Sequence, residues 1–195
     1  MDTPHEHEQH TDTPKEGTSF FSDVLRFTII ALAIVLPIRV FVAQPFIVSG
    51  SSMDPTFTDG QYLIVDEISY RLESPERGDV VIFRFPKDRS KYFIKRVIGL
   101  PGETIEIQGG AITVRNTAHP EGVVLEEPYA VADGSTFLSA TLQDEEYFVL
   151  GDNRPASSDS RSWGVLPRKF IVGRAFLRLL PVQTISVFPG VYHSE

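Results

Sequence analysis

The sequence predicts a mainly β protein, in which one antiparallel β-sheet domain follows a single N-terminal transmembrane helix. From residue 46 onward, short runs rich in Val, Ile, Phe and Tyr alternate with turn signals such as Asp59-Gly60 and Gly109-Gly110. Ahead of these runs lies one strongly apolar stretch, which a polar segment precedes. No pattern repeats at a fixed period, so a propeller or a solenoid is not expected.

The composition excludes several classes of function. The 195 residues include 18 basic and 26 acidic side chains, for a net charge of -8, so nucleic acid is not expected as a partner. The absence of cysteine excludes a thiol nucleophile, a thiolate metal site and disulfides. His5, His7 and His10 lie close together, but no second ligand cluster follows them, so no metal site is expected.

Residues 1–20 are polar and acidic, which predicts a disordered tail. Residues 21–43 are predicted to be a transmembrane anchor. The uncharged centre, Phe27 to Ile38, has only twelve residues, whereas a span needs about 17 to 25. Twelve residues alone would indicate a buried helix, but arginines at the ends of the stretch can snorkel to the interface and extend it. No small-x-small motif follows, so an uncleaved anchor is favoured over a removed signal peptide.

Residues 44–195 are predicted to form the β-rich domain. The expected strands share β-branched and aromatic residues between turns: 61–65, 80–85, 92–98, 104–107, 111–114, 147–150, 171–179 and 184–188.

Two segments carry candidate reactive groups. The first runs from Ser49 to Thr56 and contains three serines beside Gly50 and Pro55. One of these serines could be a nucleophile, or their hydroxyls could simply bind nearby backbone in a turn. The second contains Lys95, whose neighbours on the same face of a strand would be Phe93 and Val97. A lysine desolvated between them would have a lowered pKa and could act as a general base.

Two other interpretations of the basic residues stay open. The lysine segment could be a solvated surface, or it could join Arg84, Lys87 and Arg89 in a basic patch facing anionic lipid. A third segment, residues 151–164, combines Asp, Arg and Ser with the single Trp, and could be an ordered ion-pair network or a solvated loop.

Together these segments resemble the type I signal peptidases of bacteria and organelles, the Ser-Lys proteases that cut secretory signal peptides. The resemblance rests on four boxes in the family's order behind an N-terminal apolar stretch: G-S-S-M-D-P-T, R-G-D-V-V-I-F-R-F-P, Y-F-I-K-R-V-I-G-L-P-G-E and G-D-N-R-P-A-S-S-D-S-R-S-W-G. It implies an antiparallel β-sheet catalytic domain of the signal-peptidase type, in a compact version.

The resemblance also implies residue roles. Ser52 is the implied nucleophile, Lys95 the general base, and Ser157 the serine that orients the lysine amine. Asp152 with Arg96, and Asp159 with Arg161, match ion pairs that brace the site. The implied pocket for small substrate residues is lined by Phe46, Val48, Met53, Phe57, Phe93 and Ile94.

One departure concerns the oxyanion hole, the group of donors that binds the negatively charged oxygen of the intermediate. Some family members have a serine hydroxyl donor two residues before the nucleophile, where this sequence has Gly50. Ser49 or Ser51 could take that role, and the choice stays open.

The implied activity is removal of signal peptides from secreted preproteins after small residues, at A-x-A sites, without metal or cofactor. The implied location is the plasma membrane, with a single pass through the phospholipid bilayer and the catalytic domain on the extracytoplasmic face. The sequence assigns no oligomeric state. Two rivals are a self-cleaving protease of the SOS-repressor type, which would need a DNA-binding module, and an inactive β-domain that binds peptides, which would need neither Ser52 nor Lys95.

Overall fold

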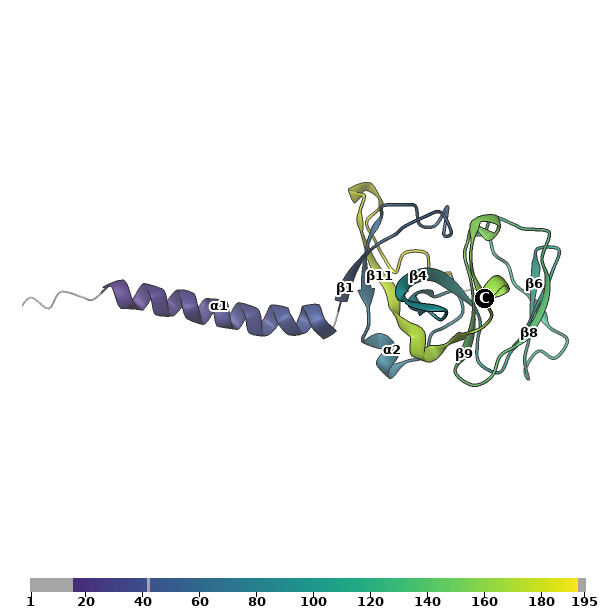
Figure 1. The fold of residues 1–195 in the computed structure, drawn as a ribbon, viewed down its shortest axis with the longest axis horizontal. Coiled ribbons are helices and arrows are strands. Elements are labelled where there is room, and N and C mark those ends of the chain that lie inside the picture. Colours follow the sequence, from purple (N-terminus) through teal and green to yellow (C-terminus); the bar gives the residue numbers. More distant parts are fainter. Residues whose placement is uncertain (1–15, 42, 193–195) are drawn as a thin grey trace, which may run out of the picture. The chain divides into compact units, whose positions relative to one another are not determined.

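The computed structural model describes residues 16–41 and 43–192, and the chain divides between residues 39 and 40 into two compact units. The first unit holds most of helix α1 (Glu16–Phe41), drawn in purple and blue in Figure 1. This helix begins at Glu16, inside the segment expected to be a disordered tail; the rest of that segment lies outside the described residues.

Helix α1 exposes large apolar side chains along its length. Phe20, Phe21 and Phe27 are between 72% and 79% exposed. In the described part of the chain, however, no helix combines the length and the apolar character that crossing a membrane requires. The structure places a helix over most of the expected anchor, and its crossing of a membrane stays a prediction.

The second unit contains two antiparallel sheets, which confirms the prediction of a mainly β fold. The larger has eight strands in the order β1-β2-β11-β3-β4-β9-β10, with β12 paired to β11. Its strands are β1 (Ala43–Ile47), β2 (Tyr62–Asp66), β3 (Val80–Phe85), β4 (Asp88–Gly99), β9 (Glu146–Leu150), β10 (Leu166–Pro167), β11 (Ile171–Leu180) and β12 (Ser186–Val187).

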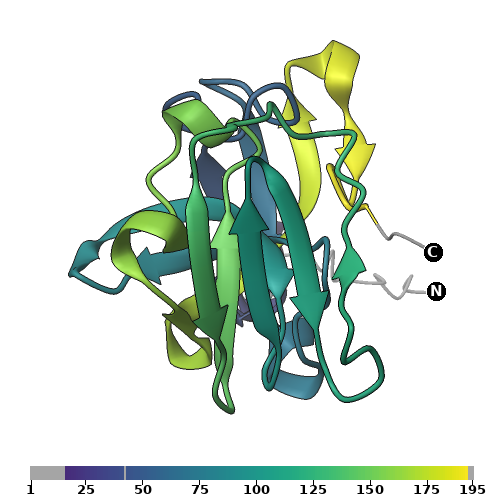
Figure 2. The same cartoon turned by 90° about the vertical axis from the view of Figure 1, so that its right-hand side faces the viewer.

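The smaller sheet, onto which Figure 2 looks, has the order β7-β6-β5-β8. It consists of β5 (Thr104–Gln108), β6 (Ala111–Arg115), β7 (Val123–Val124) and β8 (Phe137–Thr141). Strands β5 and β6 form a hairpin whose two-residue turn, Gly109-Gly110, needs positive φ angles of 57° and 91°. Helical turns complete the unit: α2 (Ser69–Leu72), α3 (Ser160–Trp163), η1 (Arg154–Ala156), η2 (Arg168–Phe170) and η3 (Val182–Thr184).

Buried apolar side chains hold these elements together. In β2, Leu63 and Val65 are buried while their neighbours are half-exposed, the alternation of a strand with one face in the core. A second cluster joins the two sheets, because it contains Ile98 and Leu150 from the larger sheet with Ile105 and Ile112 from the smaller one. The sheets therefore share one packed interface, and the larger sheet provides a rigid base for the chemistry described next.

Candidate active site

A serine hydroxyl and a lysine amine meet at the surface of the larger sheet. Ser52 lies on the turn after β1, and Lys95 lies on β4, where it pairs with Val81 of β3. The Nζ of Lys95 donates hydrogen bonds of 2.8 Å to the Oγ of Ser52 and 2.8 Å to the carbonyl of Ile94. The structure thus brings together two residues 43 positions apart.

The surroundings of Lys95 disfavour its charged form. The side chain is only 3% exposed, and its amine lies 5.4 Å from the ring centre of Phe93 on the same strand face. Burial lowers the pKa of Lys95 from 10.5 to about 8, and the negative charges of Asp159 and Asp152 limit the fall. A substantial fraction of this amine is neutral in mildly alkaline solution.

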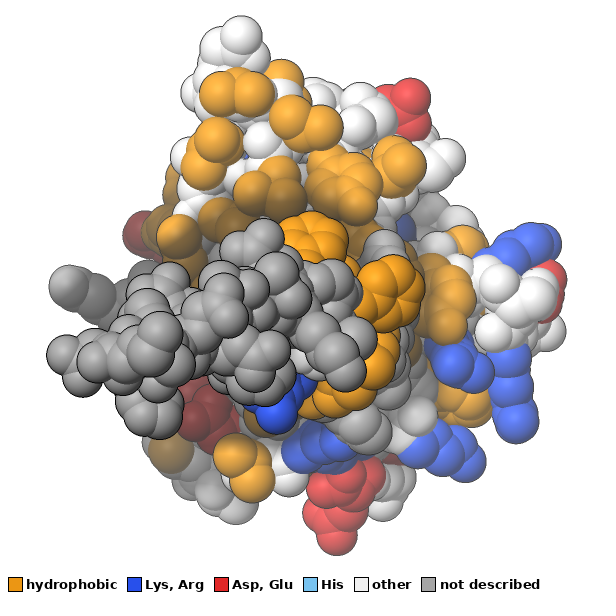
Figure 3. All heavy atoms as spheres, turned by 90° about the vertical axis from the view of Figure 1, so that its left-hand side faces the viewer, with side chains coloured by type: hydrophobic (Ala, Val, Ile, Leu, Met, Phe, Trp, Pro, Cys, Tyr) orange, Lys and Arg blue, Asp and Glu red, His pale blue; other side chains and the backbone are white. Residues whose placement is uncertain are grey.

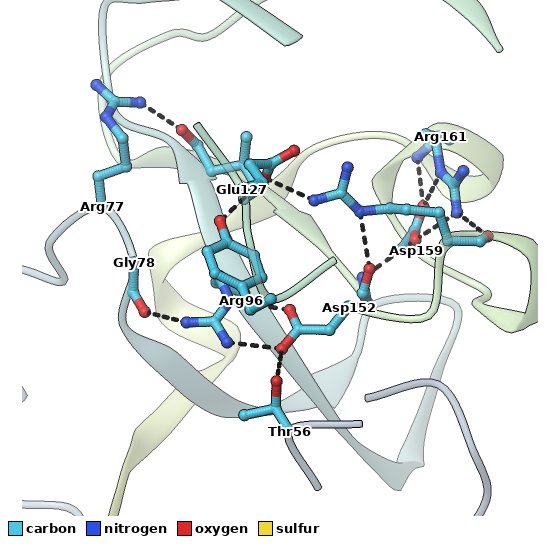
Figure 4. Close-up of polar contacts among 12 residues, drawn as sticks. Thr56, Arg77, Gly78, Arg96, Glu127, Asp152, Asp159 and Arg161 are labelled. Carbon is cyan, nitrogen blue, oxygen red and sulfur yellow. Dashed lines mark hydrogen bonds and ion pairs between the residues drawn. The ribbon is translucent and has the colours of Figure 1, made fainter. Parts of the chain in front are cut away.

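Next to the lysine, Arg96 forms a fully buried ion pair with Asp152. Its Nε and NH2 groups donate hydrogen bonds of 2.8 and 2.6 Å to the two carboxylate oxygens, and both side chains have no exposed surface. The guanidinium also donates to the carbonyls of Gly78 and Gly190, and it lies 3.8 Å from the ring centre of Tyr129. Figure 4 shows Arg96 and Asp152 at the centre of this network.

A second buried carboxylate organises the loop after β9. Asp159 accepts hydrogen bonds from the backbone of Gly151 and from the side chain of Arg161, the latter at 2.8 and 2.9 Å. Arg161 also reaches Asp133 at 3.1 Å. Burial lowers the pKa of Arg161, but its interactions with Asp159 and then Asp133 outweigh burial, so that the pKa is raised. The loop is therefore an ordered ion-pair network and not a solvated connection (Figure 4).

Two further residues, Thr56 and Asn153, connect the serine turn to this loop, and the sequence alone does not indicate this role. Thr56 donates a 2.5 Å hydrogen bond to Oδ2 of Asp152 (Figure 4). Asn153 donates two hydrogen bonds to the backbone of the turn. Its backbone N–H donates to the carbonyl of Ser52, and its side-chain Nδ2 donates to the carbonyl of Ser51. No local pattern reveals these contacts, because they join segments about a hundred residues apart.

Ser157 packs near the dyad without a hydrogen bond to it. A Cβ placed on Gly151 would lie 2.2 Å from Ser157 Oγ and 2.4 Å from Ser52 O, so these atoms surround that glycine closely. The buried Ser157 hydroxyl has no hydrogen-bond partner among the described residues. The structure shows no hydrogen bond from Ser157 to Lys95, and the orienting role of Ser157 stays a prediction.

The backbone N–H of Gly50 is occupied, since it donates a 2.7 Å hydrogen bond to Asp59. Gly50 has a φ of 88°, a conformation that favours glycine. The side chains of Ser49 and Ser51 are both exposed beside it. The N–H of Ser52 itself donates to no acceptor within the described residues.

A cavity of about 630 Å³ opens beside the serine and the lysine. Of the six side chains implied for the substrate pocket, Phe46, Val48, Phe93 and Ile94 line this cavity. Met53 and Phe57 do not line it; they are fully buried in the core beneath, with 1% and 0% exposure. Other lining residues include Ile47, Leu63, Ile82, Tyr92, Ala156 and Ser158.

Within residues 16–41 and 43–192, no three His, Asp or Glu side chains come together to hold a metal ion. His5, His7 and His10 lie outside the described residues. The groups that the site does offer are a hydroxyl, a buried amine of lowered pKa and an apolar cavity. A hydroxyl that accepts a hydrogen bond from an amine of lowered pKa, beside an apolar cavity, is an arrangement typical of serine hydrolases.

The comparisons with known proteins agree with this class. Residues 21–180 match the family described as "Signal peptidase, peptidase S26". A probable signal peptidase I-2 of Synechocystis is 37% identical over 183 residues, covering 90% of this chain and 80% of the relative. Signal peptidase I of Leptolyngbya laminosa is 38% identical over 166 residues, and signal peptidase IB of Staphylococcus aureus is 32% identical over 165. They cover 80% and 78% of this chain, and 78% and 85% of the relatives.

A crystal structure of a signal peptidase I from Enterococcus faecalis is 31% identical, with a TM-score of 0.44; the match covers 52% of this chain and 97% of that one. From the family match and the sequence relatives, the chain belongs to the signal peptidase I family, serine endopeptidases of family S26.

Proposed function

We propose that this protein is a membrane-attached endopeptidase that removes N-terminal signal peptides from secreted preproteins, with Ser52 as nucleophile and Lys95 as general base. The observation that carries the proposal is the 2.8 Å separation of Ser52 Oγ from an amine that is 3% exposed. Arginine could not replace this lysine, because its guanidinium stays protonated.

In the proposed mechanism, the neutral amine of Lys95 takes the proton of Ser52 as the hydroxyl oxygen attacks the carbonyl carbon of the scissile bond. The tetrahedral intermediate collapses when the protonated lysine gives its proton to the leaving amine, which departs as the new N-terminus. Lys95 then deprotonates a water, whose oxygen attacks the acyl carbon. The bond from this carbon to Ser52 Oγ breaks, Oγ takes the proton back from Lys95, and the signal peptide leaves with a new C-terminal carboxylate.

The N–H of Ser52 would be one donor of the oxyanion hole, since it has no acceptor within the described residues. One such donor is typically worth about 3 to 4 kcal/mol in the transition state. Ser157 remains the predicted orienting serine, and its unpartnered hydroxyl beside Gly151 leaves it free to serve.

The apolar cavity supports cleavage after small residues. It lies directly beside Ser52, and Phe46, Val48 and Ile94 provide an apolar lining that favours short side chains such as alanine. We therefore propose A-x-A sites as the cleavage sequence. Membrane attachment through α1, whose apolar side chains are exposed, would bring the domain to substrates that are themselves in the membrane; the single-pass, extracytoplasmic arrangement stays a prediction.

The proposal is tested by incubating the full chain in detergent with a preprotein that carries an A-x-A site. Ser52→Ala and Lys95→Ala should each lower the cleavage rate at least a thousandfold, whereas the exposed Thr58→Ala and Lys87→Ala should change it only a few-fold. If wild type does not cut, the proposed function fails. If it cuts and either dyad variant retains the wild-type rate, the assignment of these residues fails.

A further inference from the structure

A second cavity, of about 570 Å³, opens away from the dyad between α2, the β3–β4 hairpin and η2. Four cationic side chains line it: Arg71, Arg84, Arg89 and Lys169. The remaining charged lining group is Glu67. In a chain with a net charge of -8, this concentration of positive charge is a local exception.

These four cations have neither a hydrogen bond nor an ion pair to another described residue. Most of the other described arginines and lysines bind carboxylates, carbonyls or, for Lys95, the serine hydroxyl. The described cations with neither a hydrogen bond nor an ion pair are Arg26, Arg71, Arg84, Lys87, Arg89 and Lys169. Four of these six line this one cavity, where like charges repel unless an anion lies between them.

Aromatic rings hold several of these side chains in place. Arg89 and Lys169 lie 5.4 and 5.5 Å from the ring centre of Phe170, and Arg84 lies 5.6 Å from that of Tyr92. A guanidinium packed on a ring keeps its N–H groups free, and their fork matches the oxygens of a phosphate group. The cavity therefore presents oriented donors without acceptors of their own.

Glu67 opposes an anion in this cavity, but weakly. Its Oε1 is buried and has no hydrogen-bond partner in the described part of the chain. Burial raises the pKa of Glu67, against the opposing influence of Arg71 and Arg84. Even with this carboxylate ionised, the lining keeps an excess of three positive charges, from four cations and one anion.

The position of the cavity favours a membrane lipid as the source of the phosphate. Arg84 pairs with Tyr92 across the β3–β4 hairpin, and Tyr92 lines the catalytic cavity, so the two cavities are neighbours. Ile47 and Tyr92, on the rim of the catalytic cavity, are 66% and 43% exposed. Figure 3 shows hydrophobic side chains in the upper part of one face of the molecule, and Lys and Arg side chains, with some Asp and Glu side chains among them, in its lower and right-hand parts. Apolar and basic groups on one face suit an anionic bilayer surface.

We propose that the cavity lined by Arg71, Arg84, Arg89 and Lys169 binds the phosphate headgroup of an anionic phospholipid. Such a contact would hold the mouth of the catalytic cavity against the bilayer despite the acidic charge of the whole chain. The inference extends the membrane attachment proposed above, but its binding test does not depend on proteolysis.

Native mass spectrometry of the full chain in an uncharged detergent tests it, with phosphatidylglycerol, phosphatidylcholine, inorganic phosphate and an acidic peptide as separate ligands. Phosphatidylglycerol should bind most tightly. Each cation removed should weaken it about fivefold, so Arg71→Gln/Arg89→Gln should weaken it roughly 25-fold. Lys87→Gln/Arg115→Gln, which removes two charges outside the cavity, should change it less than twofold. Glu67→Gln should strengthen it by less than fivefold, because this carboxylate opposes the anion less than a full charge would.

Several results would overturn the proposal. Equal losses in the cavity pair and the control pair would show unspecific attraction. If phosphatidylcholine binds as tightly as phosphatidylglycerol, the cavity does not select an anionic lipid. If inorganic phosphate binds as tightly as phosphatidylglycerol, the ligand is the free ion. If the acidic peptide binds more tightly than phosphatidylglycerol, the partner is a protein segment. Preprotein cleavage in detergent should stay unchanged in the cavity variants; a chain that binds lipid but never cleaves would refute the proposed function and leave this site standing.

Discussion

Thr56 Oγ1 lies 2.5 Å from Oδ2 of Asp152, and this hydrogen bond joins the turn that carries Ser52 to the loop that follows β9. Asp152 in turn binds Arg96, the neighbour of Lys95 on β4. The three segments that carry the serine, the lysine and the loop are therefore tied together through one buried carboxylate. The positions of the two proposed reacting groups depend on this tie.

Thr56→Val should loosen the serine turn without changing the shape of the side chain. A hydrogen bond to a charged group is worth about 1.5 to 3 kcal/mol, so the free energy of unfolding should fall by about 2 kcal/mol. Misplacement of Ser52 should lower kcat roughly tenfold and leave KM within twofold. Steady-state kinetics and urea unfolding measure both effects. Thr58→Val is the matched control, since the Thr58 hydroxyl has no hydrogen bond in the described residues; an equal effect there would contradict the account.

Asp152→Asn should be among the most destabilising single changes in the β-rich unit. It leaves the buried charge of Arg96 uncompensated, which typically costs about 3 to 5 kcal/mol. Glu106→Gln breaks the half-exposed pair with Arg115 and should cost less than about 1 kcal/mol. Unfolding titrations of the two variants should differ accordingly, and similar small losses in both would show that the buried pair does not support the fold.

Gly151→Ala should displace the atoms around the dyad. The new methyl group would meet Ser157 Oγ and Ser52 O at 2.2 and 2.4 Å, far inside normal contact. We expect a loss of about 1 to 3 kcal/mol in stability, and a fall in kcat larger than that of any other glycine variant of similar stability. Gly134→Ala has only one neighbour, at 4.0 Å, and should behave as wild type. Full activity of Gly151→Ala would mean that Ser52 is not held through this contact.

Lys95→Met should make the folded protein more stable at neutral pH. The pKa of Lys95 is about 8 in the folded state, below the ordinary 10.5. Below pH 8 the folded protein must therefore keep a buried charged amine, whereas in the unfolded chain water solvates this charge, and the difference destabilises the folded state. The stability of wild type should rise between pH 8 and 10.5, where the folded state has released a proton that the unfolded state still binds. The variant should therefore gain up to roughly 3 kcal/mol at pH 7 and less at pH 10. Thermal unfolding at both pH values measures this, with Lys87→Met as control; a variant whose gain is the same at both would contradict the lowered pKa.

The sequence predicts the fold well where strands alternate or are continuously apolar. Strands β3 and β4 lie where runs of Val, Ile and Phe indicate them, and the desolvation of Lys95 follows from its position on one strand face with Phe93. Strand β1 escapes prediction because it contains Pro45 and follows the apolar helix directly, and β8 because its sequence, FLSAT, has no strong alternation. Strand β8 forms because it pairs with β5 along its whole length.

The candidate site is predictable in its residue types and less so in its contacts. The resemblance implies Phe57 as a pocket residue, but the turn directs it into the core with no exposed surface. The bond of Thr56 to Asp152 spans 96 positions, and only the assembled sheet brings its partners together. Local sequence states which side chains share a strand face; it does not state which loops meet above the sheet.

The central claim is that a neutral Lys95 activates Ser52, and the pH dependence of kcat/KM for cleavage of an A-x-A preprotein tests it most directly. Between pH 6 and 10 the account predicts a rise of about tenfold per pH unit that levels off above an apparent pKa of about 8. A rate that stays flat from pH 6 to 9 would contradict it.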